Sequence, residues 1–157
     1  MTTVAEQVGA LLGQLGAGHC FGVVGSGNFH VTNALRDAGV PFTATRHEGG
    51  ASTMADAYAR MSQQVALVSL HQGCGLTNAA TGIGEAAKSD SPVLVLAAEA
   101  SQGAVHSNFA MDQTGFATSL GAAAHRVHTP ETAIDDVLRA YRTALRQRTT
   151  VVLNLPL

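Results

Sequence analysis

Hydrophobic residues recur along the chain in two patterns, one with the period of a helix and one continuous over short runs. The first helical stripe consists of Val4, Val8, Leu11, Leu12 and Leu15. Thr3 and Glu6 stand three residues apart at its start and form a capping box, which marks the beginning of a helix. The chain is therefore expected to open with an amphipathic helix.

The same alternation continues to the end of the chain. Helical spacing is expected over residues 31–38, 49–61 and 77–88, in a short segment before residue 125, and from Pro130 to residue 145. Apolar runs typical of buried strands cover residues 19–24, 41–46, 65–70, 92–98, 125–128 and 149–155. A long connection, residues 101–112, interrupts this rhythm. Strands that alternate with helices and are apolar on both faces form parallel sheets covered on both sides. The pattern predicts one three-layer α/β/α domain over residues 1–157, with a parallel sheet of roughly six strands.

Composition narrows the class of protein. Hydrophobic residues make up 46% of the chain and charged residues 13%, with a net charge of −2, which excludes a disordered chain and a nucleic-acid-coating protein. The low charge also indicates that part of the surface is buried against partners. Cys20 and Cys74 are too few for a disulfide framework or a cysteine-based zinc site, and both are expected to be buried thiols.

The sequence shows no targeting or membrane segment. The N-terminus lacks the basic and apolar regions of a signal peptide, and the longest apolar run, residues 92–98, is far short of the roughly 20 residues that span a bilayer. A soluble, cytoplasmic protein without membrane or nucleic-acid partners is expected. Four arginines near the end of the last helix suit the helix dipole and are interpreted as a solvated face: Arg139, Arg142, Arg146 and Arg148.

Candidate chemistry lies in three loops that follow strands, where parallel sheets bind ligands. They are Gly25-Ser26-Gly27-Asn28, Arg46-His47-Glu48-Gly49-Gly50 and His71-Gln72-Gly73-Cys74-Gly75. Each loop offers glycines that let a backbone approach a ligand, and one reactive side chain: Ser26, Glu48 or His71. Glu48 has two interpretations, a helix N-terminal acid stabilised by the dipole or a carboxylate held in an apolar cleft for acid chemistry.

Two other classes of site match poorly. A dinucleotide fingerprint would need a third glycine where residue 30 is histidine, and no acidic residue closes the following strand. No histidine is paired with a carboxylate at metal-ligand spacing, so no metal ligand is assigned within this chain. Four histidines are interpreted as structural: His19, His30, His125 and His128.

Over nearly its whole length the sequence resembles the pyrimidine-binding (Pyr) domain of thiamine-diphosphate enzymes, in the branch with acetolactate synthase, pyruvate decarboxylase and benzoylformate decarboxylase. Four segments in the family order carry the resemblance: Phe21-Gly22-Val23-Val24-Gly25-Ser26, Arg46-His47-Glu48-Gly49-Gly50-Ala51, Ala55-Asp56-Ala57-Tyr58-Ala59-Arg60 and Gly73-Cys74-Gly75-Leu76-Thr77-Asn78-Ala79. The resemblance implies a lyase or transferase that decarboxylates or ligates a small 2-oxo acid.

The resemblance also implies roles for individual residues. Glu48 matches the glutamate that shares a proton with pyrimidine N1′ and thereby promotes the ylide at thiazolium C2. His71 and Ser26 match positions that carry a proton-relay histidine and an active-site serine in the decarboxylases, so both are expected to be catalytic. Further cofactor contacts are expected from Val24, Gly25, Gly73, Cys74 and Asn78, and weaker substrate contacts from Gln72 and Gln113.

Half of such a site is missing from the chain. The family binds Mg²⁺ and the diphosphate in a pyrophosphate-binding (PP) domain marked by Gly-Asp-Gly and a later Asn, and no Gly-Asp-Gly occurs here. The central domain of the larger family members is also missing. The PP domain is therefore expected on a partner subunit, in a heterotetramer resembling two-subunit sulfopyruvate decarboxylases, or elsewhere in a longer chain. The alternatives are a non-catalytic regulatory or binding subunit that kept the fold, and a stand-alone nucleotide-binding domain.

Overall fold

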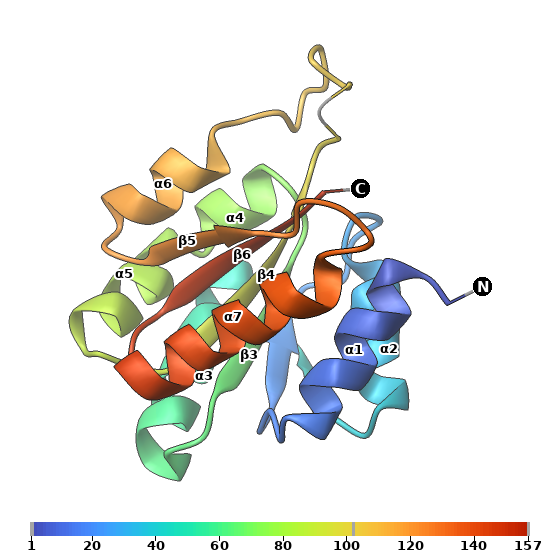
Figure 1. The fold of residues 1–157 in the computed structure, drawn as a ribbon. Helices are drawn as coiled ribbons and strands as arrows, with labels where there is room; N and C mark the ends of the chain where they lie inside the picture. Colours follow the sequence, from blue (N-terminus) through green and yellow to red (C-terminus); the bar gives the residue numbers. More distant parts are fainter. Residues whose placement is uncertain (1, 102, 157) are drawn as a thin grey trace.

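A parallel six-stranded sheet forms the centre of the computed structural model, which describes residues 2–101 and 103–156 (Figure 1). The strand order is β2-β1-β3-β4-β6-β5. The strands are β1(Cys20–Gly22), β2(Phe42–Ala44), β3(Ala66–Leu70), β4(Val93–Glu99), β5(Ala123–Arg126) and β6(Val151–Pro156). The helices are α1(Val4–Gln14), α2(Phe29–Asp37), α3(Glu48–Ser62), α4(Cys74–Asn78), α5(Ala80–Lys88), α6(Gln113–Ser119) and α7(Ala133–Gln147).

Helices cover both faces of the sheet. One apolar cluster joins the sheet to α1, α2 and α7 through side chains such as Leu12, Leu35 and Val137. A second cluster joins the other face to α3, α4, α5 and α6. The predicted α/β/α layers and parallel six-stranded sheet are confirmed, as is the capping box, in which Glu6 and Thr3 bond each other's backbone N–H groups.

A change of direction at the centre of the sheet creates a crevice. Strands β1 and β3 are neighbours, but β1 leads into α2 on one face and β3 leads into α4 on the other. The two connecting loops diverge at the carboxyl ends of the strands, and α/β folds bind ligands at such a point. The connecting segments at this point are residues 23–28 and 71–73, which overlap two of the loops selected from the sequence, residues 25–28 and 71–75.

Several expected boundaries were wrong. The helix expected over residues 77–88 is broken at Ala79, whose carbonyl accepts a hydrogen bond from the Ser52 hydroxyl of α3. The strand expected at residues 125–128 is Ala123–Arg126, because the His128 backbone N–H is bound by the Asp136 carboxylate instead of a strand. Helix α7 begins at Ala133, since the turn closed by Thr132 precedes it.

Burial also differs from expectation at specific positions. Ile134 and Leu145 were assigned to the buried face of the last helix but are exposed, and small residues such as Ala140 and Ala144 face the core instead. Cys20 is buried as expected, whereas Cys74 is exposed at the start of α4. Across residues 2–101 and 103–156, no helix has both the length and the hydropathy required to cross a bilayer.

Candidate functional site

The loop after β1 is held by a buried asparagine that the sequence analysis did not select. Asn28 Oδ1 accepts a hydrogen bond from the Gly25 N–H at 2.8 Å, and Nδ2 donates to the Val23 carbonyl at 3.1 Å and to Ser69 Oγ at 3.0 Å. The Asn28 amide thus bonds two residues of its own loop and one residue of the adjacent strand β3. Ser26 is thereby left exposed at the crevice.

His71 follows β3 and faces that loop. Its Nδ1 lies 3.0 Å from the Gln72 carbonyl, and its Nε2 lies 3.3 Å from Ser26 Oγ. Because a carbonyl oxygen only accepts, Nδ1 carries the ring proton in the neutral imidazole, and Nε2 is free to accept from the Ser26 hydroxyl. The Phe109 ring packs edge-on against the imidazole, with centroids 4.9 Å apart. Ser26 and His71 therefore form one hydrogen-bonded pair.

Glu48 is the first residue of helix α3. The His47 ring caps the helix by accepting the Gly49 N–H at Nδ1, 3.0 Å away. The half-buried Glu48 carboxylate accepts a hydrogen bond at Oε2 from Asn78 Nδ2 at 3.0 Å, and it forms no ion pair within residues 2–101 and 103–156. A carboxylate without a basic partner keeps its other oxygen available for a ligand.

Gly75 marks where these groups converge. A methyl group built on its Cα would lie 3.1 Å from His71 Cβ and 3.6 Å from Glu48 Oε1. A side chain at this position would crowd His71, so glycine lets the His71 and Glu48 side chains lie close to the same point. Three of the loops selected from sequence supply this one region.

Gln113 is placed differently from expectation. Its side chain is only 1% exposed, and its Oε1 accepts the Gly73 N–H at 3.0 Å. Its Nε2 donates to the Ala98 carbonyl at 3.1 Å and to Asn154 Oδ1 at 2.9 Å. Gly73 has a φ of +61°, which an L side chain rarely adopts. Within this chain, Gln113 therefore orients the turn that follows His71.

Gln72 has a buried amide without a matching partner. The residue is 8% exposed, and its Oε1 is buried with no hydrogen bond among the described residues. The amide lies beneath Gly27, where a Cβ would overlap Oε1, so only glycine allows this approach. A buried polar atom left unpaired costs about 1–3 kcal/mol, so Gln72 Oε1 is an acceptor that lacks a partner among the described residues.

The remaining candidates lie at the same edge of the sheet. Val24 is exposed beside Gly25, and Cys74 and Asn78 bound the short helix α4. No group of three or more His, Cys, Asp or Glu side chains that could hold a metal ion occurs among the residues that the structure describes. The roles assigned to these side chains stay predictions.

The chain matches one protein-family profile and several curated proteins. A family profile described as "Thiamine pyrophosphate enzyme, N-terminal TPP binding domain" matches residues 2–124. A probable 2-ketoarginine decarboxylase of Pseudomonas aeruginosa is 36% identical over 94 residues, which are 60% of this chain and 17% of that protein. An acetolactate synthase large subunit of Buchnera aphidicola is 36% identical over 96 residues, again 60% of this chain and 17% of that protein.

A solved structure extends the likeness to the whole fold. The thiamine diphosphate-dependent 4-hydroxybenzoylformate decarboxylase of Rhodococcus jostii RHA1 superimposes with a TM-score of 0.88 at 25% identity, over 98% of this chain and 30% of that chain. The matches to the two relatives named above cover only 17% of their length. The chain therefore spans a small part of the proteins that it resembles.

Proposed function

The chain belongs to the thiamine pyrophosphate enzyme N-terminal domain family, and from this premise we propose that it forms the pyrimidine half of the active site of a 2-oxo-acid decarboxylase or carboligase. The observation that carries the proposal is Glu48, a half-buried carboxylate with no basic partner among the described residues, whose Oε1 lies 3.6 Å from the position of a Cβ on Gly75. The hydrogen-bonded Ser26–His71 pair is close by, because the same Cβ would lie 3.1 Å from His71 Cβ.

The residues present fit an aminopyrimidine. A ring nitrogen needs a proton donor or acceptor, which Glu48 provides. A flat ring needs a surface without a protruding side chain, which the exposed Gly50 offers, because no atom lies within 4 Å of the place where its Cβ would be. When bound, thiamine diphosphate supplies a thiazolium carbon that adds to the 2-oxo group and accepts the electron pair released with CO₂. Glu48 would share a proton with pyrimidine N1′, while Asn78 holds the second carboxylate oxygen in place. Val24, Gly25, Gly73 and Cys74 would line the ring's binding surface.

The Ser26–His71 pair would move a proton on the substrate side. The Gln72 carbonyl keeps the ring proton on Nδ1, so Nε2 accepts from the Ser26 hydroxyl and can return a proton through the same oxygen. Phe109 covers one side of the imidazole and limits its contact with water. Of the two glutamines, Gln72 has an amide oxygen without a partner and is the proposed substrate contact, whereas the Gln113 amide makes three internal hydrogen bonds.

The diphosphate and Mg²⁺ would be held outside this chain, because no Gly-Asp-Gly sequence occurs in it. We assign them to a PP domain, on a partner subunit in a heterotetramer or elsewhere in a longer chain. The active enzyme thus requires both halves.

A titration of the isolated chain with thiamine diphosphate tests this division. We expect weak binding that does not depend on Mg²⁺, with NMR amide shifts confined to residues 24–28, 48–50 and 71–78. Glu48→Gln should reduce these shifts, whereas Glu85→Gln, at an exposed glutamate of α5 that pairs with Arg60, should leave them unchanged. Micromolar, Mg²⁺-dependent binding would contradict the divided site, and shifts elsewhere would contradict the pyrimidine site.

A further inference from the structure

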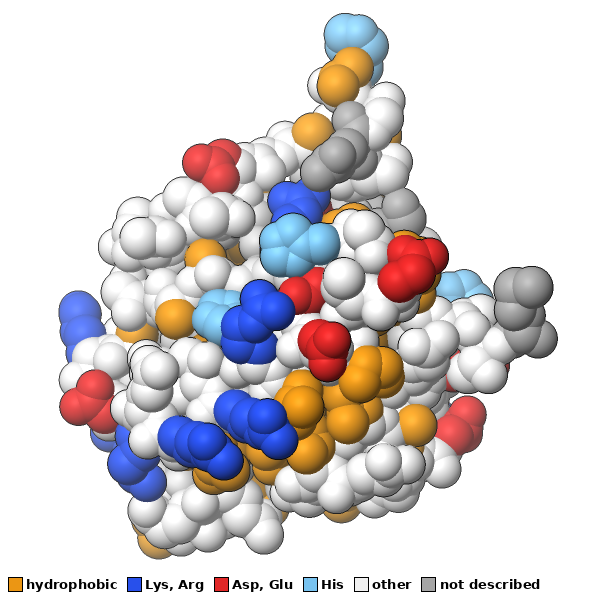
Figure 2. All heavy atoms as spheres, in the orientation of Figure 1, with side chains coloured by type: hydrophobic (Ala, Val, Ile, Leu, Met, Phe, Trp, Pro, Cys, Tyr) orange, Lys and Arg blue, Asp and Glu red, His pale blue; other side chains and the backbone are white. Residues whose placement is uncertain are grey.

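A pocket outside the candidate active site lies at the far edge of the sheet, between strand β5 and the first half of α7. Its volume is about 470 Å³, and it is lined by Thr114, Ala124, His125, Arg126, His128 and Arg139. Strands β4 and β6 separate it from β3 and the Ser26–His71 pair. Its lining includes two guanidinium groups, two imidazoles and a hydroxyl, with no carboxylate, and Figure 2 shows Arg and His side chains gathered on this face.

Two carboxylates that do not line the pocket, those of Glu99 and Asp136, pair with its cationic side chains. The Glu99 side chain is 11% exposed and its two oxygens lie 3.0 and 2.8 Å from Arg126 Nη1 and Nη2. The Asp136 side chain is 3% exposed and accepts from His128 Nδ1 at 3.0 Å, while Arg139 Nη2 lies 3.3 Å away. A buried acid that bonds a cation beside the pocket restricts the position of that cation.

Asp136 keeps its charge in this arrangement. Burial favours its neutral form, but hydrogen bonds from the His128 backbone and ring and from Thr132 outweigh burial and lower the pKa of the carboxyl group. Because the carboxylate only accepts, His128 Nδ1 carries a proton and Nε2 points away from Asp136. Protonation of Nε2 would add a further donor.

The pKa of the His125 imidazole depends on the same charged groups. Burial lowers the pKa of its imidazole, the Arg139 charge lowers it further, and Asp136 opposes the change. Arg126 is its neighbour on β5. An anion in the pocket would reverse this balance and favour the imidazolium, so anion binding should be coupled to proton uptake.

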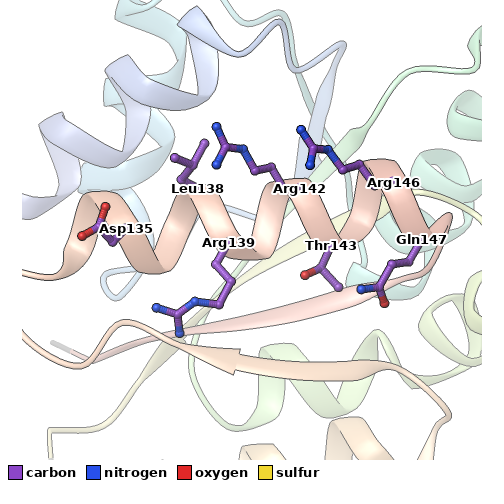
Figure 3. A pocket seen from close by; sticks show the side chains of 7 residues that line it. All are labelled: Asp135, Leu138, Arg139, Arg142, Thr143, Arg146 and Gln147. Carbon is purple, nitrogen blue, oxygen red and sulfur yellow. The ribbon is translucent and has the colours of Figure 1, made fainter.

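Arg139 differs from the other arginines of its helix. Its side chain is 61% exposed and points toward β5, whereas Arg142 and Arg146 point to the opposite side of α7 (Figure 3). Arg139 is exposed, as expected from the sequence, but it lies on a different side of α7 from Arg142 and Arg146. Arg146 is a control for charge on the same helix.

We propose that this pocket binds the phosphate group of a small phosphorylated molecule, through Arg126, Arg139, His125 and His128. Fixed guanidinium N–H groups match a phosphate oxyanion, and each charge-assisted bond is among the stronger hydrogen bonds in proteins. The proposal does not depend on the function proposed above, because it uses none of the same residues.

Calorimetry with sulfate, inorganic phosphate and glycerol phosphate tests the proposal. We expect saturable binding of sulfate that tightens from pH 7.5 to pH 5.5, because sulfate keeps its charge over this range while a bound anion favours the imidazolium form of His125. Arg139→Ala should weaken binding about tenfold or more, and Arg146→Ala less than about twofold. Tighter binding of glycerol phosphate than of phosphate would identify an ester as the ligand, and equal binding would identify free phosphate.

Two results would overturn the proposal. One is the absence of saturable binding of all three anions at millimolar concentration. The other is equal weakening by Arg139→Ala and Arg146→Ala, which would show that the net charge of α7 attracts anions without a defined site. His125→Gln provides a second test, since it should reduce the pH dependence of sulfate binding, and ring NMR signals of His125 should shift on binding.

Discussion

Replacing Glu48 with glutamine tests the centre of the proposed function. Glutamine has the same shape, and its carbonyl oxygen can still accept the hydrogen bond from Asn78 Nδ2 that Glu48 Oε2 accepts at 3.0 Å. The amide would then turn its NH₂ group toward the ring nitrogen of the cofactor. It could form a hydrogen bond there, but it has no proton to transfer, so the change removes acid–base function and little else.

The expected magnitudes separate a chemical effect from a structural one. General acid–base groups typically contribute about 10²–10⁴-fold to rate, so exchange of the C2 hydrogen of bound thiamine diphosphate should slow by that order. Glu48 is half-buried at the first position of α3, where a negative charge stabilises the helix dipole by about 0.3–1 kcal/mol. The variant should therefore lose at most a few degrees in Tm.

Hydrogen–deuterium exchange at C2, followed by NMR in the complete enzyme, provides the assay. Glu85→Gln is the matched control, because it makes the same chemical change at a residue of α5 whose partner is Arg60. It should exchange at the wild-type rate. If Glu48→Gln also exchanges at the wild-type rate, Glu48 does not activate the cofactor and the reasoning is refuted.

Three further predictions concern neighbouring residues. His71→Ala should slow turnover while C2 exchange stays near normal, because the imidazole acts on the substrate side; slow exchange in this variant would contradict that role. Gln113→Leu should destabilise the fold by roughly 3 kcal/mol or more in urea denaturation, because it leaves the Gly73 N–H and two acceptors without partners; an unchanged midpoint would contradict this. Ellman's reagent should modify the exposed Cys74 in the native protein and the buried Cys20 only after unfolding. Burial raises the pKa of the Cys20 thiol to about 12, so little reactive thiolate forms there. Labelling of both cysteines in the native protein would contradict this prediction.

The local pattern of hydrophobic and polar residues was sufficient to predict the layers of the fold. Strands β3 and β4 are apolar on both faces because helices cover both, and that requirement is visible in residues 65–70 and 92–98 without any partner. The Thr3–Glu6 capping box depends on residues three apart, so it too could be predicted. The loops at the carboxyl ends of the strands follow from the same alternation.

Contacts between distant segments could not be predicted in this way. Gln113 bonds the Gly73 N–H across forty positions, and Asn28 bonds Ser69 across forty-one, so their roles depend on strand order. The break at Ala79 depends on a hydroxyl from α3. In each case a polar group finds its partner only after β1, β3 and β4 lie side by side.

The sequence by itself determined the periodicities, the helix start at Thr3 and the residue types at the crevice, because these depend on neighbours along the chain. Only the tertiary structure decided that Ser26 faces His71, that Glu48 accepts a hydrogen bond from Asn78 beside Gly75, and that Arg139 turns toward β5. The physical reason is that hydrogen bonds, ion pairs and burial act over a few ångströms in space. Distance along the chain does not specify them.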